Sequence, residues 1–175
     1  QVPGLDFVVG PDGYRRLGDL LESDAPASAV RLDRQETYAG ILPRREAGVR
    51  AWLTVMRGCD RFCTFCVVPF VRGRERSLPL DVLRTELDHI AAAGFREVVL
   101  LGQTVNSWRH GEDGFGDLLR MACSIEGIER VREAVDGECA DTWVADDDLK
   151  VVARGGIALV RGADIVGEPR GDGGD

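Results

Sequence analysis

Several features that mark common protein classes are absent from this sequence. It has no apolar run long enough to cross a membrane, and its start shows neither the basic residues nor the apolar stretch of a secretion signal. Only two histidines are present, and no initiator methionine precedes Gln1. We therefore expect a cytoplasmic location, no membrane partner, and a chain that begins inside a longer one.

The acidic charge of the protein is concentrated near its end. The net charge at pH 7 is −8, and residues 133–175, with eleven acidic and four basic side chains, account for −7 of it. In contrast, residues 57–76 carry five arginines against two acids. Such a basic stretch attracts a carboxylate or a phosphate backbone, but a solvated loop explains the same charges, and charge alone favours the loop.

The apolar pattern predicts an α/β protein. We expect strands at 5–10, 51–56, 97–101 and 128–132, and helices at 14–21, 77–94 and 117–125. Residues 23–29 are predicted to be a linker, and residues 30–49 are polar and irregular. From residue 50 onward, strands and helices alternate, which indicates a parallel sheet or a partial (βα) barrel.

Three of the five cysteines lie within eight residues, as Cys59-x-x-x-Cys63-x-x-Cys66. An odd number of cysteines without a secretion signal argues against a disulfide framework. Thiolates are the usual ligands of iron–sulfur clusters, and three of them leave one iron of a [4Fe–4S] cluster open to another ligand. A structural zinc ion requires a fourth ligand, and His89 and His110 are distant in the sequence.

The cysteine segment and residues 102–106 each follow a predicted strand. In parallel α/β folds, functional sites form at the carboxyl ends of the strands. We therefore expect both segments to lie on one face and to share a ligand.

The cysteine spacing resembles that of the radical S-adenosylmethionine superfamily. The segments WLTVMRGCDRFCTFCVVPFVRGRERS (52–77) and LLGQTVNSW (100–108) resemble the methylthiotransferase family, in the branch that acts on N6-dimethylallyladenosine next to the anticodon of tRNA. The resemblance implies a [4Fe–4S] cluster that binds S-adenosylmethionine and cleaves it to methionine and a 5′-deoxyadenosyl radical. It also implies tRNA as substrate and an electron donor such as flavodoxin or ferredoxin.

Carried over by residue, the resemblance assigns the cluster to Cys59, Cys63 and Cys66. It places Phe65 near the adenine of S-adenosylmethionine, and Gly102 and Gln103 would help to hold that cofactor. The charged segment 72–76 positions the cofactor or RNA, or forms a salt-bridged loop, and the two interpretations have equal weight. Trp108 stacks on a base or, as we favour, packs within its loop, and Cys123 is interpreted as a buried small residue.

The resemblance divides the chain into four parts. Residues 1–29 correspond to the end of an α/β N-terminal methylthiotransferase domain, 30–49 to a linker and 50–132 to a partial radical S-adenosylmethionine core. Residues 133–175 form an acidic, poorly ordered tail without assignment, as a frameshift or a mis-assembled gene end would produce.

Two family features are missing from this sequence: the cysteines of a second, sulfur-supplying [4Fe–4S] cluster and the RNA-binding β-barrel. We therefore expect the isolated chain to be inactive in sulfur transfer. Two alternatives remain open. The first is a methylthiotransferase for another tRNA adenosine or for a ribosomal protein side chain. The second is a non-catalytic, truncated iron–sulfur fragment.

Overall fold

The computed structural model of the chain describes residues 5–23, 27–133, 149–152 and 158–161. The chain forms two compact units. The first unit combines residues 1–38 with residues 57–76, and the second combines residues 39–56 with residues 77–175. The cysteine segment therefore belongs to the same unit as the N-terminal segment.

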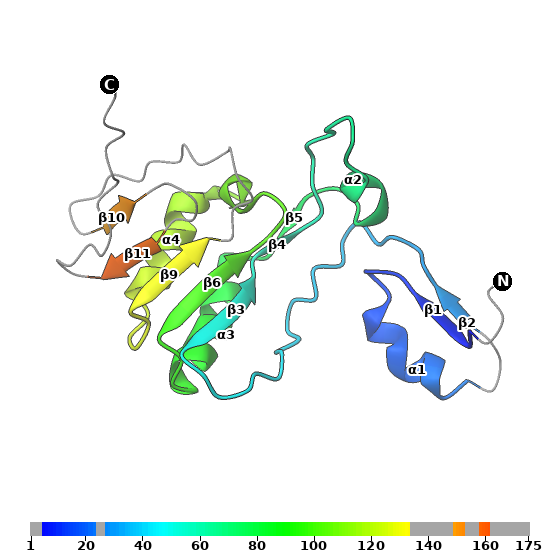
Figure 1. The fold of residues 1–175 in the computed structure, drawn as a ribbon, viewed down its shortest axis with the longest axis horizontal. Coiled ribbons are helices and arrows are strands. Elements are labelled where there is room, and N and C mark those ends of the chain that lie inside the picture. The colour runs from blue at the N-terminus through cyan, green and yellow to red at the C-terminus, as the bar shows by residue number, and fades with distance from the viewer. Residues whose placement is uncertain (1–4, 24–26, 134–148, 153–157, 162–175) are drawn as a thin grey trace, which may run out of the picture. The chain divides into compact units, whose positions relative to one another are not determined.

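The second unit is built on a sheet with strand order β10–β11–β9–β6–β3 (Figure 1). Its strands are β3 (Arg50–Thr54), β6 (Glu97–Leu101), β9 (Arg130–Glu133), β10 (Leu149–Val152) and β11 (Ala158–Arg161). Strands β3, β6 and β9 run parallel, which confirms the predicted parallel arrangement. Strand β11 pairs with β9 and with β10 in antiparallel fashion, so the whole sheet is mixed.

Two helices connect the parallel strands, α3 (Leu80–Ala92) between β3 and β6 and α4 (Phe115–Ser124) between β6 and β9. Leu83, Leu87 and Ile90 are buried on α3, as their helical spacing predicts. Gly94 follows α3 with a φ of +84°, a conformation that ends many helices. Burial of each such aliphatic side chain contributes roughly 1.5–3 kcal/mol, so the apolar face of α3 fixes the helix on the core.

The core of this unit is formed by side chains from the sheet, from the two helices and from the segments that connect them. Its largest fully buried members are Trp108, Leu53, Met56, Leu83, Leu87, Ile90, Leu100, Leu118, Leu119 and Ile128. Residues 97–100 of β6 are all buried, whereas β3 alternates between exposed and buried positions. Strand β6 therefore lies between its parallel neighbours β9 and β3 with both faces covered, and β3, at the edge of the sheet, buries only one face within this unit.

Glu97, at the start of β6, is a buried acid held by three arginines. Its carboxylate lies 2.5 Å from Arg50 Nε, 3.1 Å from Arg130 Nη1 and 3.3 Å from Arg132 Nε. Burial acts to raise the pKa of Glu97, but the hydrogen bond from Arg50, the charge of Arg132 and the hydrogen bond from Arg130 outweigh it and hold the pKa below its usual value. The network thus joins the first residues of β3, β6 and β9.

Replacing Glu97 by glutamine should reduce the free energy of unfolding at pH 7 by about 1–3 kcal/mol. Because the pKa is lowered in the folded state, the stabilisation is present above pH 4.5 and is lost as the pH falls through the folded value. Urea unfolding curves from pH 7 to acid pH should show the two proteins converging. Glu129→Gln, which removes an exposed ion pair with Arg96, is the control and should cost at most about 1 kcal/mol. A constant difference at all pH values would contradict the assignment.

The first unit contains two parallel strands, β1 (Phe7–Val9) and β2 (Ala27–Ala29), in register from Phe7↔Ala27 to Val9↔Ala29. Between them lie the 3₁₀ helix η1 (Tyr14–Arg16) and α1 (Leu17–Leu21), as predicted. The interpretation of residues 27–29 as linker is wrong. Small residues such as Ala27 give little strand signal, and the strand is specified by its pairing with β1.

The remaining elements are short. The helix α2 (Val68–Val71), in the first unit, follows the cysteines. The strands β4 (Met56–Arg57) and β5 (Arg76–Ser77), at the two ends of the cysteine segment, pair with each other. The segment after β6 contains η2 (Val105–Ser107) and the hairpin of β7 (Arg109–His110) and β8 (Asp113–Gly114). No helix or strand occurs in residues 30–49, as predicted.

Much of the predicted poorly ordered tail, residues 134–148, 153–157 and 162–175, lies outside the described residues. The sequence predicts no sheet strand between these segments, whereas the structure places β10 and β11 there. Among the helices of the described residues, none has the length and apolar character needed to cross a membrane.

Candidate functional site

The two ends of the cysteine loop, residues 58–60 and 73–75, are held together by backbone and side-chain contacts. We call these residues the loop base. Cys59 donates its backbone N–H to Gly73 O at 3.2 Å. The Asp60 carboxylate accepts two bonds from Arg74, at 2.5 and 3.0 Å, and one from the Glu75 N–H at 3.0 Å. The hydrogen bonds from Arg74 and Glu75 lower the pKa of Asp60. The two ends of the loop are therefore held together at one fixed point.

Gly58 is required at the loop base by two independent features. Its φ of +74° is unfavourable for any residue with a side chain. A Cβ at this position would lie 2.0 Å from Arg74 O and 2.6 Å from Gly73 O, far inside van der Waals contact. Because both oxygens belong to the backbone, no side-chain rotation relieves the overlap.

The three cysteines of the motif differ in exposure. Cys59 is 7% exposed, and its sulfur accepts the Arg61 N–H at 3.4 Å. Cys63 is exposed and Cys66 is half-buried, and the Cys66 N–H bonds to Cys63 O at 3.0 Å. In the described part of the chain, no three histidine, cysteine or acidic side chains come close enough to hold a metal ion. The loop therefore carries all three thiols, but their sulfurs are not gathered at one point.

The chemistry of the donor set fits an iron–sulfur cluster. None of the thiols of Cys59, Cys63, Cys66 or Cys123 forms a disulfide, so each keeps the sulfur that ligation requires. Residues 59–67 contain no helix or strand, so convergence of the sulfurs breaks no regular structure. Cys123 lies on α4 in the other unit, and Cys139 lies outside the described residues.

Apolar side chains stand exposed around the cysteines. Phe65 is 92% exposed, and Phe62 and Phe70 are mostly exposed and meet edge to face, with ring centroids 6.1 Å apart. The Arg74 guanidinium lies over the Phe62 ring at 5.5 Å. Large exposed aromatic groups mark surfaces that bind another molecule, which agrees with the predicted role of Phe65 beside a cofactor without testing it.

Arg74 and Arg76 of the charged segment, and Arg57 before the cysteines, are engaged within their own unit. Arg76 forms an ion pair with Asp12 at 3.1 Å, with side chains that are 9% and 0% exposed. Arg76 also donates to Arg72 O and to Asp33 O, and Arg57 stacks on the Tyr38 ring at 4.4 Å. The salt-bridged interpretation therefore describes Arg76 and Arg74. Sequence reasoning missed Asp12, because no local pattern marks a partner 64 residues away.

The second predicted segment, after β6, belongs to the other unit. Gly102 packs so closely on Met56 that a Cβ would lie 2.4 Å from Met56 Cγ. Gln103 is exposed, and its side-chain amide bonds to no described residue. Trp108 is fully buried in the core, which confirms the packed interpretation. Since the cysteine loop and this segment lie in different units, a ligand shared between them stays a prediction.

Comparison with known proteins locates the cysteine motif within a recognised family. The model of the radical SAM superfamily matches residues 53–162. The chain is 48% identical over 130 residues to a tRNA-2-methylthio-N(6)-dimethylallyladenosine synthase of Chlorobaculum tepidum, a match that covers 72% of the chain and 28% of that protein. Proteins of the same name from Chlorobium luteolum and Thermodesulfovibrio yellowstonii are 51% and 39% identical over 139 and 134 residues, and each match covers 75% of the chain and 31% of the relative. The chain thus spans less than a third of the length of these relatives.

Proposed function

The chain belongs to the radical SAM superfamily, and from this premise we propose that it forms the S-adenosylmethionine-binding part of a tRNA methylthiotransferase. The observation that supports the proposal best is the triplet Cys59, Cys63 and Cys66. These thiols lie on one loop inside the family match, and none is in a disulfide.

In this proposal the three cysteines hold a [4Fe–4S] cluster, which when bound supplies the electron that cleaves S-adenosylmethionine and starts radical chemistry. The loop base orients the ligands by fixing Cys59 against Gly73 and by holding Asp60 with Arg74. Cys63, which is exposed, and Cys66, which is half-buried, would complete the ligand set.

The cofactor-binding residues in the proposal are Phe65, Gly102 and Gln103. The exposed ring of Phe65 offers an apolar surface for the adenine. The side-chain amide of Gln103 forms no hydrogen bond to a described residue. It follows the carboxyl end of β6, the end of the strands where parallel α/β folds bind ligands. Strands β3, β6 and β9 with α3 and α4 would be the first part of a (βα) barrel.

The proposed substrate is N6-dimethylallyladenosine in tRNA, next to the anticodon. Support comes from the names of the relatives, which are 39–51% identical to this chain over the matched residues. A protein electron donor, such as flavodoxin or ferredoxin, would deliver the reducing electron. We also propose that this chain alone does not transfer sulfur to the tRNA.

The proposal is tested by anaerobic reconstitution of the 175-residue chain with iron and sulfide. We expect the chain to bind about one cluster, measured as iron and sulfide content and as the electron paramagnetic resonance signal after reduction. Added S-adenosylmethionine should then change that signal and yield 5′-deoxyadenosine.

Cys63→Ala should lose the cluster and all 5′-deoxyadenosine formation, because two thiolates do not retain it. Cys123→Ala is the matched control, since this residue lies on α4 in the other unit, and it should bind wild-type amounts of iron. Equal iron content in the two variants would refute the assignment of the cysteine triplet.

A further inference from the structure

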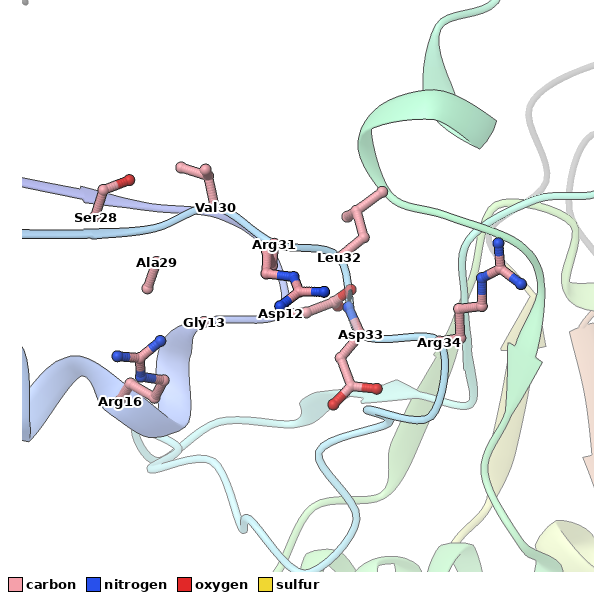
Figure 2. A pocket seen from close by; sticks show the side chains of 10 residues that line it. All are labelled: Asp12, Gly13, Arg16, Ser28, Ala29, Val30, Arg31, Leu32, Asp33 and Arg34. Carbon is pink, nitrogen blue, oxygen red and sulfur yellow. Dashed lines mark hydrogen bonds between the residues drawn. The ribbon is translucent and has the colours of Figure 1, made fainter.

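The first unit contains a pocket at the carboxyl ends of β1 and β2. Its volume is about 490 Å³, within the roughly 300–1,000 Å³ of small-molecule sites. One wall consists of Asp12, Gly13 and Arg16, which follow β1, and the other of the residues from Ser28 to Arg34, on and after β2 (Figure 2). The carboxyl ends of parallel strands form the crevice where open α/β sheets bind ligands.

Three arginines line this pocket without an ion pair. Arg16, Arg31 and Arg34 are exposed, and none of the three guanidinium groups bonds to a described residue. In Figure 2, Arg16 lies near Gly13, Arg31 lies in the middle of the view and Arg34 lies at the far end. Unpaired guanidinium groups on opposite walls of a pocket favour an anionic ligand.

The two acids of the pocket do not neutralise these arginines. The Asp12 side chain is fully buried and is paired with Arg76, and its Oδ2 also accepts the Asp33 N–H at 3.0 Å. The Asp33 Oδ1 accepts the Gln35 N–H at 2.8 Å. With Asp12 balanced by Arg76, the three arginines face only Asp33, and the pocket keeps a positive charge.

At Gly13 the backbone after β1 packs closely on the end of β2. Gly13 is buried, and a Cβ there would lie 2.6 Å from Ala29 O. The chain after β1 therefore approaches the end of β2 with no side chain between them. This close approach brings Arg16 and Arg31 to the same pocket although they are distant in the sequence.

We propose that this pocket binds a phosphate group. The planar guanidinium donates two parallel hydrogen bonds to phosphate oxygens, and arginine is favoured wherever such paired recognition matters. A free phosphate or nucleotide and the backbone of a polynucleotide both supply it. The proposal does not rest on the proposed function, because phosphate binding in this unit needs no cluster and no S-adenosylmethionine.

The test is calorimetric titration of the 175-residue chain, in chloride buffer, with inorganic phosphate and with adenosine 5′-monophosphate. The double variant Arg16→Gln/Arg31→Gln should bind both at least about tenfold more weakly, since each charge-assisted bond contributes substantially to affinity. The double variant Arg16→Lys/Arg31→Lys should be intermediate, because it keeps the charge but loses the paired donors.

Arg44→Gln/Arg84→Gln is the matched control, because it removes two exposed arginines outside the pocket. Its affinity for phosphate should equal that of the wild type, and thermal melts should show that all variants fold. Absence of phosphate binding, equal weakening in the control, or equal competition by succinate would overturn the proposal.

A single-stranded RNA oligonucleotide distinguishes the two sources of the phosphate. If RNA displaces bound phosphate, and if the arginine variants lose affinity for RNA by the same factor as for phosphate, the ligand is a polynucleotide backbone. Failure of RNA to displace the phosphate would identify a free phosphate or nucleotide. Either outcome supports phosphate binding in the pocket, provided that the arginine variants have weakened it. Cys63→Ala, which should lose the cluster, should bind phosphate as the wild type does.

Discussion

Replacing Gly58 by alanine should disrupt the base of the cysteine loop and abolish cluster incorporation. The backbone here has a φ of +74°, which costs a residue with a side chain roughly 1–2 kcal/mol. The added Cβ would also overlap Arg74 O at 2.0 Å, so the two segments of the loop base must separate. We expect a local loss of about 3–5 kcal/mol in total, enough to open the loop.

Gly73 offers a matched control in the same loop base. Its φ of +77° is nearly the same, but a Cβ there would meet only the end of the Arg76 side chain, at 3.8 Å. Gly73→Ala should therefore show the conformational cost alone, about 1–2 kcal/mol. Hydrogen exchange at the Cys59 and Glu75 amides, both bonded across the loop base, measures the difference. Equal exchange rates in the two variants would show that the close contact at Gly58 is unimportant.

Removal of the Asp12 carboxylate should destabilise the first unit by about 3–5 kcal/mol, because it leaves the Arg76 guanidinium buried without a counter-charge. The Asp12 side chain is fully buried and the Arg76 side chain is 9% exposed. The pair also joins the turn after β1 to the end of the cysteine segment. In Asp12→Ala we therefore expect rapid hydrogen exchange at the Asp33 amide, which Asp12 accepts directly, and at the loop base.

The double variant Asp12→Ala/Arg76→Leu separates the ion pair from general packing. With both charges removed, much of the lost stability should return, since a buried pair is often no more stabilising than apolar side chains of similar size. Asp19→Ala, an exposed acid on α1, is the control and should change the free energy of unfolding by less than about 0.5 kcal/mol. If Asp12→Ala were as mild as Asp19→Ala, the structural role of the buried pair would be wrong.

Elements with strong periodicity are those that sequence reasoning located best. The stripe of Leu83, Leu87 and Ile90 predicted α3, and the continuous apolar run of β6 predicted a buried parallel strand, because each pattern reflects the face that must be buried. Strand β2 was missed, since its small residues carry no such pattern. The short α2, next to the cysteines, was missed because four residues are too few to show helical periodicity.

The sequence by itself identified the family of this protein, because the residues around Cys59, Cys63 and Cys66 match it. The spacing of these three thiols also predicts a ligand set, and that ligand set stays a prediction. Only the tertiary structure decided what holds that loop, because the Gly58 contact with Arg74 and the pairing of Asp12 with Arg76 join residues far apart along the chain. The same holds for the arginine pocket, whose walls come from two strands that meet only when β2 pairs with β1.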